Sequence, residues 1–433
     1  MAVERDGVPT VAVHTSVFAR LARATALANG MPRMRQAFVP QPIVDKSPAE
    51  LRAYIEGNDP VSKRPFMQEL LEDLTRPLDD EDLKGISFER STPRLLEPNT
   101  EENLQRLFIE NHWTDFLPIT LPTEERVARM LAGTSHAPDE VVGRMRPTRF
   151  REFWEFTVEK VAVNAVMAGA RPEYFPVILA LAASGVTARS SSTTSMATIS
   201  VVNGPIRNEI GMDAGIGVMG PYNHANATIG RAYSLLSQNL QGGSVPGETY
   251  MGSLGNWYMY SACFPENEER SPWEPMHVQR GFKSTDSAVS LFFGARYTHS
   301  GYGPRETWQE RFRRCFAAFE HFPPLLVLDP IVARGFVDRG FATKRELIEW
   351  CAENARLPAR EYWDDQWIQT IERPLAVAGV EPLATRLRAA PDDIIQIFEP
   401  SDINIVVAGG ETQGAWKMFG CRYEKTISVD AWR

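Results

Sequence analysis

The sequence predicts an α/β protein in which parallel or mixed sheets are flanked by helices, with a mainly helical insertion. Strand and helix patterns alternate from the start, with an apolar, β-branched run at residues 7–15 followed by a helical pattern at residues 16–29. Later apolar runs at residues 324–330 and 403–411 end in Asp-Pro and Gly-Gly-Glu, as strands of α/β proteins do. This alternation favours a Rossmann-like arrangement.

The elements are expected in three segments. Residues 1–45 hold the first strand, its helix and a second strand at residues 36–42, which together make part of an α/β layer. Residues 46–150 are expected to be mainly helical, beginning at a Ser47-x-x-Glu50 capping box. Residues 151–433 are expected to form an α/β domain with a polar pocket, and no internal repeat is evident in the sequence.

Composition excludes several classes of partner. The net charge of -9 argues against nucleic acid, because binding a polyanion requires a positive surface. No apolar run approaches 18 residues, so no membrane span is expected, and the N-terminus lacks the apolar core of a signal peptide. The four cysteines lie far apart without a C-x-x-C pair, which favours a reduced, cytoplasmic protein: Cys263, Cys315, Cys351 and Cys421.

Two helical patterns at residues 153–170 and 172–184 are apolar nearly all round and are expected to be buried. Glu173 stands between them, in the first turn of the second helix, where the helix dipole favours a negative charge. A carboxylate between two buried helices is equally a candidate catalytic group. Both interpretations of Glu173 remain open.

Residues 201–240 combine many glycines with polar side chains, among them Asn203, Arg207, Asn226 and Arg231. Gly215, Gly217 and Gly220 match G-x-G-x-x-G by spacing, but Pro221 follows and no helix opens there, so a dinucleotide site is not predicted. We expect the glycines to allow close approach of the backbone to a ligand or another chain. Asn226 suits either a helix N-cap or an amide contact to a ligand.

A dense acidic segment follows at residues 263–282, with Glu266, Asn267, Glu268 and Glu269 close together and Trp273 downstream. Carboxylates this close repel one another, so one of them is expected to have a raised pKa suited to general acid catalysis. Binding of a hard cation or an exposed acidic loop are the alternatives. Histidine-based metal motifs and the G-x-S-x-G motif are absent from the sequence, and no cofactor can be identified from it.

Three further sites are smaller. The turn His14-Thr15-Ser16 at the end of the first strand could receive an anion or a partner, or simply cap the following helix. Glu411 ends the last apolar run and is a candidate substrate-binding residue. The Ser/Thr run at residues 190–195 precedes a buried strand and is expected either to line a pocket or to be a short linker.

Four stretches of this sequence resemble proteins of the UGSC family, at residues 7–43, 157–181, 201–232 and 266–282. The family is named for a motif of selenocysteine or cysteine followed by Gly-Ser-Cys. It is more distantly similar to the selenoprotein B component of glycine, sarcosine and betaine reductase. The resemblance covers most of the chain and implies an α/β fold and a reactive thiol or selenol.

The chain departs from the family at that motif, since Cys-Gly-Ser-Cys occurs nowhere in it. In relatives the motif lies just upstream of the strand that begins here at Gly7, six residues after the first methionine. The resemblance therefore implies a split enzyme, in which a small subunit carries the Cys or Sec motif and docks on the strand at residues 7–15. This chain would be the large subunit of the heterodimer.

With the nucleophile supplied in trans, the expected activity is that of an oxidoreductase or lyase. It would make or break a C–S or C–N bond or reduce a small carboxylate-bearing molecule. A metal-dependent lyase or hydratase using Glu266–Glu269, and a non-catalytic scaffold paralogue, are the alternatives. The predicted roles are proton transfer by Glu173, Glu266 or Glu268, partner or anion contact by His14, Thr15 and Ser16, and substrate binding by Asn203, Arg207, Asn226, Arg231, Asn267, Trp273 and Glu411.

Overall fold

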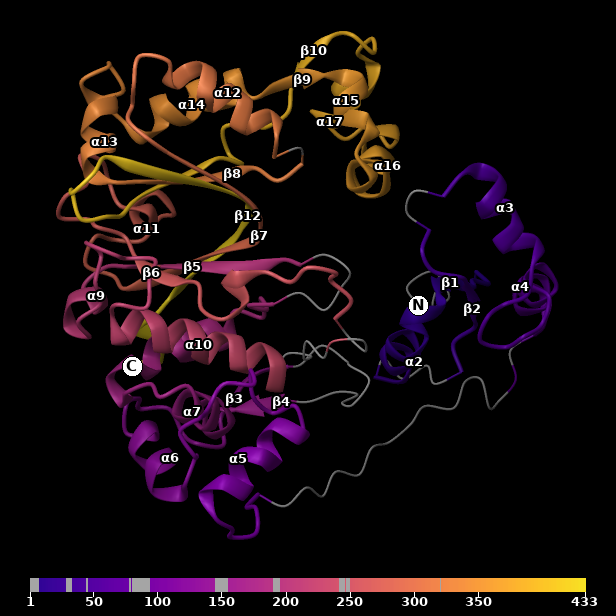
Figure 1. The fold of residues 1–433 in the computed structure, drawn as a ribbon, viewed down its shortest axis with the longest axis horizontal. Helices are drawn as coiled ribbons and strands as arrows, with labels where there is room; N and C mark the ends of the chain where they lie inside the picture. The colour runs from indigo at the N-terminus through magenta and orange to yellow at the C-terminus, as the bar shows by residue number, and fades with distance from the viewer. Residues whose placement is uncertain are drawn as a thin grey trace.

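The computed structural model describes residues 8–28, 33–43, 46–77, 79, 94–144, 155–189, 195–240, 246, 250–319 and 321–433. The described residues up to residue 79 form an N-terminal unit, and those from residue 94 onward form the main body (Figure 1). The predicted boundaries at residues 45 and 150 stay predictions. Most of the run at residues 190–195 lies outside the described residues, which include only its last member, Ser195.

The N-terminal unit is built on a parallel pair of strands, β1 (Ala12–Thr15) and β2 (Gln36–Val39). The 3-10 helix η1 (Ser16–Phe18) and α2 (Ala19–Ala28) lie between them in sequence, as the strand–helix–strand pattern predicted. Two more helices follow, α3 (Pro48–Glu56) and α4 (Phe66–Thr75), and the predicted capping box at Ser47 and Glu50 is confirmed. Its buried apolar cluster is small: Ala19, Ala22 and Phe38, with Val61 packed against them.

The next segment contains α5 (Glu101–Glu110), α6 (Glu124–Leu131) and an antiparallel pair, β3 (Val141–Arg144) and β4 (Glu155–Thr157). Thr100 and Thr123 cap the two helices by accepting a hydrogen bond from the backbone N–H three residues later.

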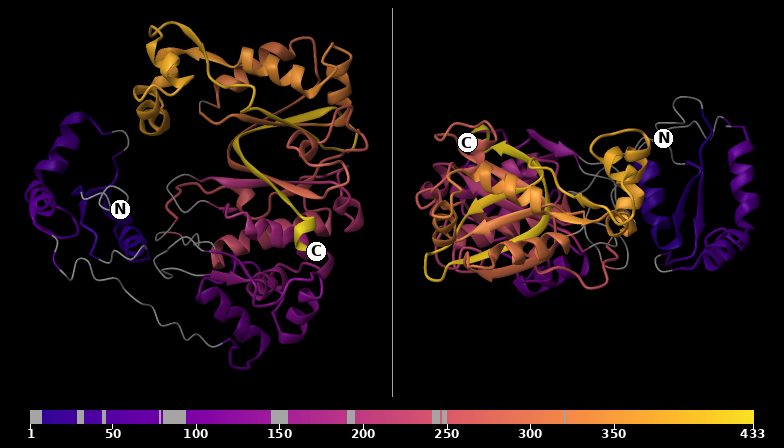
Figure 2. Two further views of the ribbon diagram at one scale, coloured as in Figure 1. Left: turned by 180° about the vertical axis from the view of Figure 1, so that it is seen from behind. Right: turned by 90° about the horizontal axis from the view of Figure 1, so that it is seen from above.

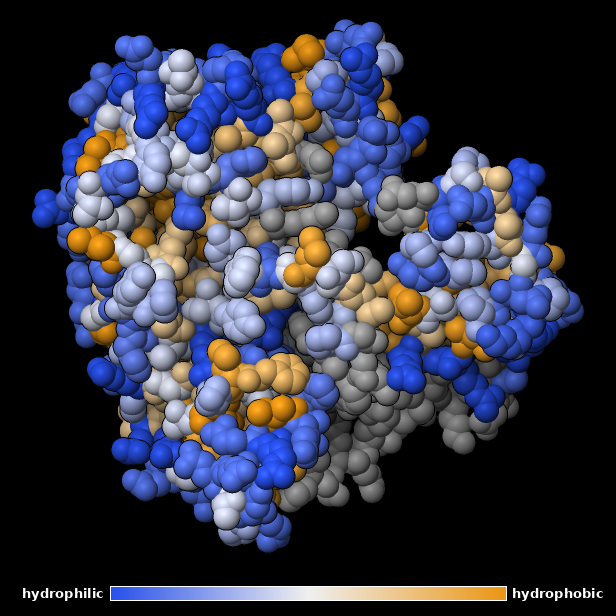
Figure 3. Space-filling view, in the orientation of Figure 1, coloured by the Kyte–Doolittle hydropathy of each residue, from blue (hydrophilic) through white to orange (hydrophobic). Residues whose placement is uncertain are grey.

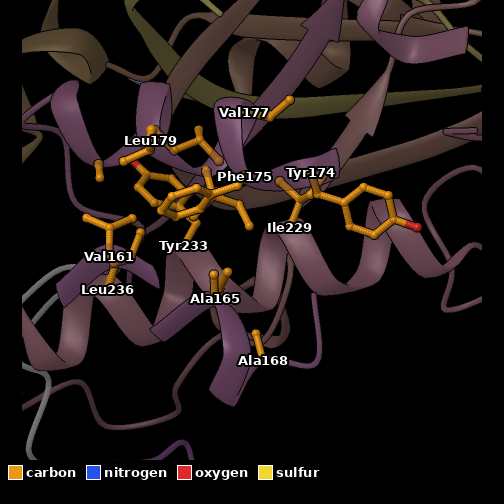
Figure 4. Close-up of a cluster of buried hydrophobic side chains, with 14 of the residues drawn as sticks. Val161, Ala165, Ala168, Tyr174, Phe175, Val177, Leu179, Ile229, Tyr233 and Leu236 are labelled. Carbon is orange, nitrogen blue, oxygen red and sulfur yellow. The ribbon is translucent and has the colours of Figure 1, made fainter. Parts of the chain in front are cut away.

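Two apolar helices lie within the predicted ranges 153–170 and 172–184, namely α7 (Val158–Met167) and α8 (Phe175–Ala183), with the 3-10 helix η2 (Pro172–Tyr174) before α8. The prediction was wrong for residues 155–157, which form β4. All of α8 except Ala183 is buried. These helices pack with α10 (His224–Asn239) in one apolar layer, where Phe175 and Tyr233 lie between Val161, Leu179 and Leu236 (Figure 4).

The main sheet has six strands in the order β11-β8-β12-β7-β5-β6. The strands are β5 (Ala197–Asn203), β6 (Cys263–Pro265), β7 (Ala288–Tyr302), β8 (Pro324–Leu328), β11 (Asn404–Val407) and β12 (Ala415–Ser428). The pairs β5/β6 and β8/β11 are parallel, whereas the long strands β7 and β12 pair antiparallel at the centre. The predicted α/β fold with a parallel or mixed sheet is therefore confirmed, and the sheet is mixed.

The two halves of this sheet share one topology. In the first half, β6 lies outside β5 and β7 lies inside it, and in the second half β11, β8 and β12 have the same order and relative directions. The sequence shows no repeat because the shared feature is the path of the backbone.

The sheet curls strongly, as the long ribbons of β7 and β12 show in Figure 2. The curl brings the ends of the two edge strands together, and the backbone N–H of Asn267 donates to the carbonyl of Val407 at 2.7 Å. Apolar side chains from all six strands fill the inside of the curl, including Val201, Phe264, Leu325 and Val406. Helices cover both outer faces, so the fold has one inner core and two outer ones.

The outer helices of the second half are α12 (Trp308–Ala317), α13 (Pro330–Val337) and α14 (Lys344–Asn354). Their apolar faces meet at Trp308, whose ring lies edge-on to those of Phe312 and Phe336. The surface above α12 and α14 carries mainly hydrophilic side chains (Figure 3). The remaining elements are α9 (Ile206–Glu209), η3 (Trp257–Met259), α11 (Met276–Gln279), β9 (Arg356–Pro358), α15 (Ala359–Asp364), the π-helix η4 (Ile368–Glu372), α16 (Arg373–Val377), α17 (Leu383–Arg388), β10 (Ile394–Gln396) and η5 (Asp430–Trp432).

Candidate functional site

Polar side chains gather where β5 and β6 end. Asn203 is the last residue of β5, and Glu266 directly follows β6. Because the strands are parallel, their carboxyl ends lie at the same edge of the sheet. Nδ2 of Asn203 donates to Oε2 of Glu266 at 2.7 Å and to Oε1 of Glu268 at 2.9 Å. We name the group at this edge the Glu266 cluster: Asn203, Arg207, Glu266, Glu268, Glu269, His277 and Lys344.

Glu266 is fully buried and its carboxylate is surrounded by donors. Oε1 accepts from Nζ of Lys344 at 2.8 Å and from the backbone N–H of Val407 at 3.4 Å. Oε2 accepts from Asn203 and from the backbone N–H of Met276, both at 2.7 Å. A buried charge is tolerated only when it is paired and hydrogen-bonded, and Glu266 meets both conditions. Glu266 thus fixes β5, β6, β11 and α14 relative to one another.

Arg207 separates the carboxylates on either side of it. Its buried guanidinium donates to the carbonyl of Glu266 at 2.7 Å, lies 3.1 Å from Oε1 of Glu268, and donates to Oε1 of Glu269 at 2.9 Å. The hydrogen bond from Arg207 outweighs burial and lowers the pKa of Glu269 to about 2. Glu269 is therefore not the carboxylate of raised pKa that the crowding of this segment predicts, because the hydrogen bond from Arg207 favours its charged form.

His277 is a residue of α11, lies beside Glu268 and is fully buried. Neither ring nitrogen has a hydrogen-bond partner, and Nδ1 is 3.9 Å from Oε1 of Glu268. Oδ1 of Asn203 is likewise buried without a partner. A buried polar atom without a hydrogen-bond partner destabilises the folded state, so these atoms around Glu268 lower the stability of the protein.

Asn267 and Glu411 lie at the adjoining edge, where the sheet closes. Nδ2 of Asn267 donates to the carbonyl of Gly409 at 3.0 Å, so its amide holds the loop after β11. Glu411 has a φ of 58° and contacts Arg334 and Arg270. Its backbone N–H donates to Oδ2 of Asp329 at 3.0 Å. The fold thus brings Asn267 next to the Glu266 cluster and gives Glu411 cationic partners of its own.

Trp273 and Asn226 occupy structural positions. Trp273 is buried in the outer core of the second half, and its Nε1–H donates to the carbonyl of Phe341 at 3.2 Å. Asn226 donates to the carbonyls of Asp213 and Val218 at 2.8 and 3.3 Å, so it braces the glycine-rich loop. The N-cap of α10 is Asn223, not Asn226. Asn226 also lines a cavity of 190 Å³ on the inner side of the sheet.

Arg231 lies apart from the Glu266 cluster. It donates to both carboxylate oxygens of Asp115 at 2.9 Å and to the carbonyl of Pro118. Burial opposes ionisation of Asp115, but hydrogen bonding and the charge of Arg231 prevail and lower its pKa. Asp115 is therefore held as a carboxylate.

Glu173 is about half exposed in η2, and its carboxylate is 3.9 Å from Arg171. It is not among the contacts of the Glu266 cluster, so a role in proton transfer stays a prediction from sequence alone.

The turn His14-Thr15-Ser16 belongs to the N-terminal unit. Thr15 occupies the N-cap position of η1 without a side-chain capping bond. Nε2 of His14 and Oγ1 of Thr15 are buried without a partner, and burial lowers the pKa of His14. The capping interpretation therefore accounts for the position of Thr15 at the start of η1. It does not account for the Thr15 hydroxyl, which makes no capping hydrogen bond.

Lys344 and His277 were not predicted as site residues. Lys344 follows the capping Thr343 at the start of a helix, where the dipole disfavours a cation, and this is a weak sign of a nearby carboxylate. His277 is unusual in an acidic segment, but sequence gives no measure of its burial. The contact of Lys344 with Glu266 joins residues 78 positions apart. The burial of His277 depends on its enclosure by the folded chain.

All four cysteines are buried free thiols. Burial raises the pKa of Cys263 to about 12 and also raises the pKa of Cys315, Cys351 and Cys421. A thiol whose pKa is raised by burial is a poor nucleophile near neutral pH.

Over the described ranges, no group of three or more His, Cys, Asp or Glu side chains is arranged to hold a metal ion. In the acidic segment, Lys344 forms an ion pair with Glu266, and Arg207 forms ion pairs with Glu268 and Glu269. Within the same ranges, no helix has the length and apolar character needed to cross a membrane.

Residues 1–61 match the model of the UGSC family. No curated protein and no solved structure matches the chain. The match falls on the segment that contains β1 and β2, where the sequence resemblance begins. This match supports membership of the chain in the UGSC family.

Proposed function

We propose that this chain is the large subunit of a thiol- or selenol-dependent enzyme. It makes or breaks a C–S or C–N bond of a small carboxylate-bearing substrate, or reduces that substrate. The reactive Cys or Sec residue is carried by a small partner subunit.

One observation carries the proposal, namely the burial of every cysteine in the chain. The resemblance to a family defined by a reactive Cys or Sec calls for a thiolate or selenolate, and a nucleophile of this kind needs access to substrate and a low pKa. Cys263, Cys315, Cys351 and Cys421 have neither. The nucleophile therefore comes from outside these four residues.

The proposed nucleophile can act in two reactions, a substitution and a reduction. In a substitution, the thiolate or selenolate attacks a substrate carbon, a C–S or C–N bond breaks, and the departing atom takes a proton. An acceptor thiol or amine then attacks the same carbon, displaces the sulfur or selenium of the motif, and loses its proton. In a reduction, the second sulfur of the motif then attacks the first. The two thiols become a disulfide or a selenenyl sulfide, and the released electron pair with a proton converts the carbon to C–H. An external dithiol restores the motif.

The Glu266 cluster supplies the proton in this proposal. Glu268 and His277 lie 3.9 Å apart between Oε1 and Nδ1, and His277 has no other partner to hold its ring. A carboxylate beside an imidazole is a combination of side chains used in general acid–base catalysis. Glu266 is enclosed by four donors and acts in positioning Asn203 rather than in proton exchange.

The partner docks on β1. Within the described residues β1 pairs with β2 alone, and a two-stranded sheet with a small apolar cluster is marginally stable by itself. Val13 of β1 is about half exposed. A third strand added beside β1 would cover it and occupy the open edge.

The metal-dependent alternative has less support, because the carboxylates it requires are engaged by Lys344, Arg207 and Asn203. A non-catalytic scaffold differs from the proposed subunit in one respect, since it has no partner that carries the Cys or Sec motif.

The decisive experiment is purification of the native complex followed by alkylation near pH 7. We expect a stoichiometric partner that contains Cys- or Sec-Gly-Ser-Cys, alkylated at that motif, while the four cysteines of this chain stay unmodified. Release of a thiol or an amine from small carboxylates that bear C–S or C–N bonds should stop on alkylation. Rapid modification of a cysteine in the folded chain, or turnover by this chain alone, would refute the proposal.

A matched pair of variants tests the docking strand. Val13→Lys places a charge on the exposed side of β1 and should release the partner. Val380→Lys changes a valine of similar exposure in the loop after α16 and should leave the complex intact. Equal partner retention by both variants would remove β1 as the docking site.

A further inference from the structure

A second cavity, of about 390 Å³, lies away from the Glu266 cluster. It is bounded by the C-terminal half of α10, the loop that contains Asp115 and the segment around η3. Its volume is in the range of small-molecule sites. Among the described residues that line it, Arg189 and Asp115 carry charge.

Arg189 is almost completely buried at this cavity, with 9% of its surface exposed. Its Nε donates to the carbonyl of Met259 and its Nη1 donates to Oε1 of Gln238, both at 2.9 Å. Both acceptors are neutral. Burial lowers the pKa of Arg189, because removal from water disfavours its charged form.

Asp115 attracts Arg189, but both of its oxygens are bound by Arg231. Among the described residues at the cavity, one carboxylate thus faces two guanidinium groups, and a net positive charge remains. Gln238 cannot compensate either, because its Nε2 donates to the carbonyls of His112 and Thr114 and only fixes its orientation. A buried cation in an open cavity is favourable only when an anion joins it.

Apolar side chains form the rim of the cavity and are exposed to solvent. Leu254 is 97% exposed and Trp257 is 88% exposed, with Phe116 and Tyr260 each about half exposed. Large apolar side chains left in water beside a cavity are typical of a ligand-binding rim. The segment that carries Trp257 is nevertheless anchored, because Nδ2 of Asn256 donates to the carbonyls of Ser195 and Ala295.

We infer that this cavity binds a small organic anion, with its carboxylate on Arg189 and an apolar or aromatic body against Trp257 and Leu254. A guanidinium binds a carboxylate with directional, charge-assisted hydrogen bonds. The inference does not rest on the proposed function, because carboxylate binding needs no Cys or Sec and is measured on the 433-residue chain alone.

The experiment compares phenylacetate with its uncharged analogue phenylacetamide by isothermal titration calorimetry. The two probes have nearly the same shape, so the difference isolates the charge. We expect phenylacetate to bind at least about tenfold more tightly. Equal affinities, or no binding of phenylacetate at concentrations up to about 10 mM, would overturn the inference.

Variants locate the binding. Arg189→Gln should remove the preference for phenylacetate, whereas Arg345→Gln makes the same charge change on the exposed face of α14 and should preserve it. Preference retained by folded Arg189→Gln contradicts the site.

Trp257→Ala provides an independent check if Arg189→Gln fails to fold, because an 88% exposed side chain contributes little to folding. It should weaken both probes by the same factor of about three or more. Unchanged affinity for phenylacetate would place the ligand elsewhere.

Discussion

Nζ of Lys344 lies 2.8 Å from Oε1 of Glu266, and both side chains are fully enclosed by the protein. Lys344 begins α14, which covers the second half of the sheet, while Glu266 directly follows β6 in the first half. The pair therefore ties together two halves that share one topology. It also sets the carboxylate that orients Asn203 toward Glu268.

Replacement of Lys344 by methionine should destabilise the protein by about 3–5 kcal/mol, because it leaves the Glu266 carboxylate buried without its counter-charge. A thermal melt followed by circular dichroism would show the midpoint several degrees lower. Lys46→Met removes an ion pair of the same 2.8 Å length at the surface, between Lys46 and Glu50, and should leave the midpoint nearly unchanged. Equal shifts for the two variants would contradict the buried-pair interpretation.

The pKa of Glu269 predicts a stability change in acid. Its folded-state pKa, about 2, lies below the ordinary value of 4.5, so its contribution is fully present above pH 4.5 and is lost as the pH falls toward 2. Melting temperatures of the wild type and Glu269→Gln should differ by a constant amount above pH 5 and converge between pH 4.5 and about 2.

Glu274→Gln serves as the control for that series, because Glu274 is an exposed carboxylate of the same segment. A pH dependence of Glu274→Gln equal to that of Glu269→Gln would mean that general charge, not Arg207, is responsible.

Gly204 should not tolerate alanine. Its φ is +83°, and an added Cβ would lie 2.1 Å from the carbonyl oxygen of Asp286, so both backbone strain and steric overlap oppose the substitution. Gly211 has a φ of +65° but open space around its Cβ position, so Gly211→Ala bears the strain alone, about 1–2 kcal/mol.

We expect Gly204→Ala to lower the melting midpoint well beyond Gly211→Ala, and to displace Glu268, which accepts from the N–H of Gly204 at 2.8 Å. Equal midpoints would show that the loop relaxes freely around Gly204.

His277→Leu should leave the melting temperature unchanged or raise it. The substitution removes two buried nitrogens that have no hydrogen-bond partner and keeps a similar volume. Asn226→Leu is the matched contrast, since its side-chain amide makes hydrogen bonds to Asp213 and Val218 and its loss should destabilise the protein by about 1–3 kcal/mol. Strong destabilisation by His277→Leu would indicate a structural role for the imidazole.

Local sequence patterns predicted an element of this fold well where the structure depends on neighbouring residues in the chain. Ser47 and Glu50 form the expected capping box, and the apolar runs of α7 and α8 are buried as their composition indicates. The same reasoning identified the segment around Glu266 as a concentration of polar groups. It could not tell that Glu269 would have a lowered pKa, because the decisive cation, Arg207, is about 60 residues away.

The amino-acid sequence by itself determined the alternation of strands and helices, the burial of α7 and α8, and the absence of a Cys-Gly-Ser-Cys motif. Such properties follow from side-chain chemistry and short-range periodicity. Tertiary structure alone decided that Lys344 meets Glu266, that His277 is enclosed without a partner, and that Arg189 stands in an open cavity. These relationships depend on the tertiary fold, which brings together residues that no local interaction connects.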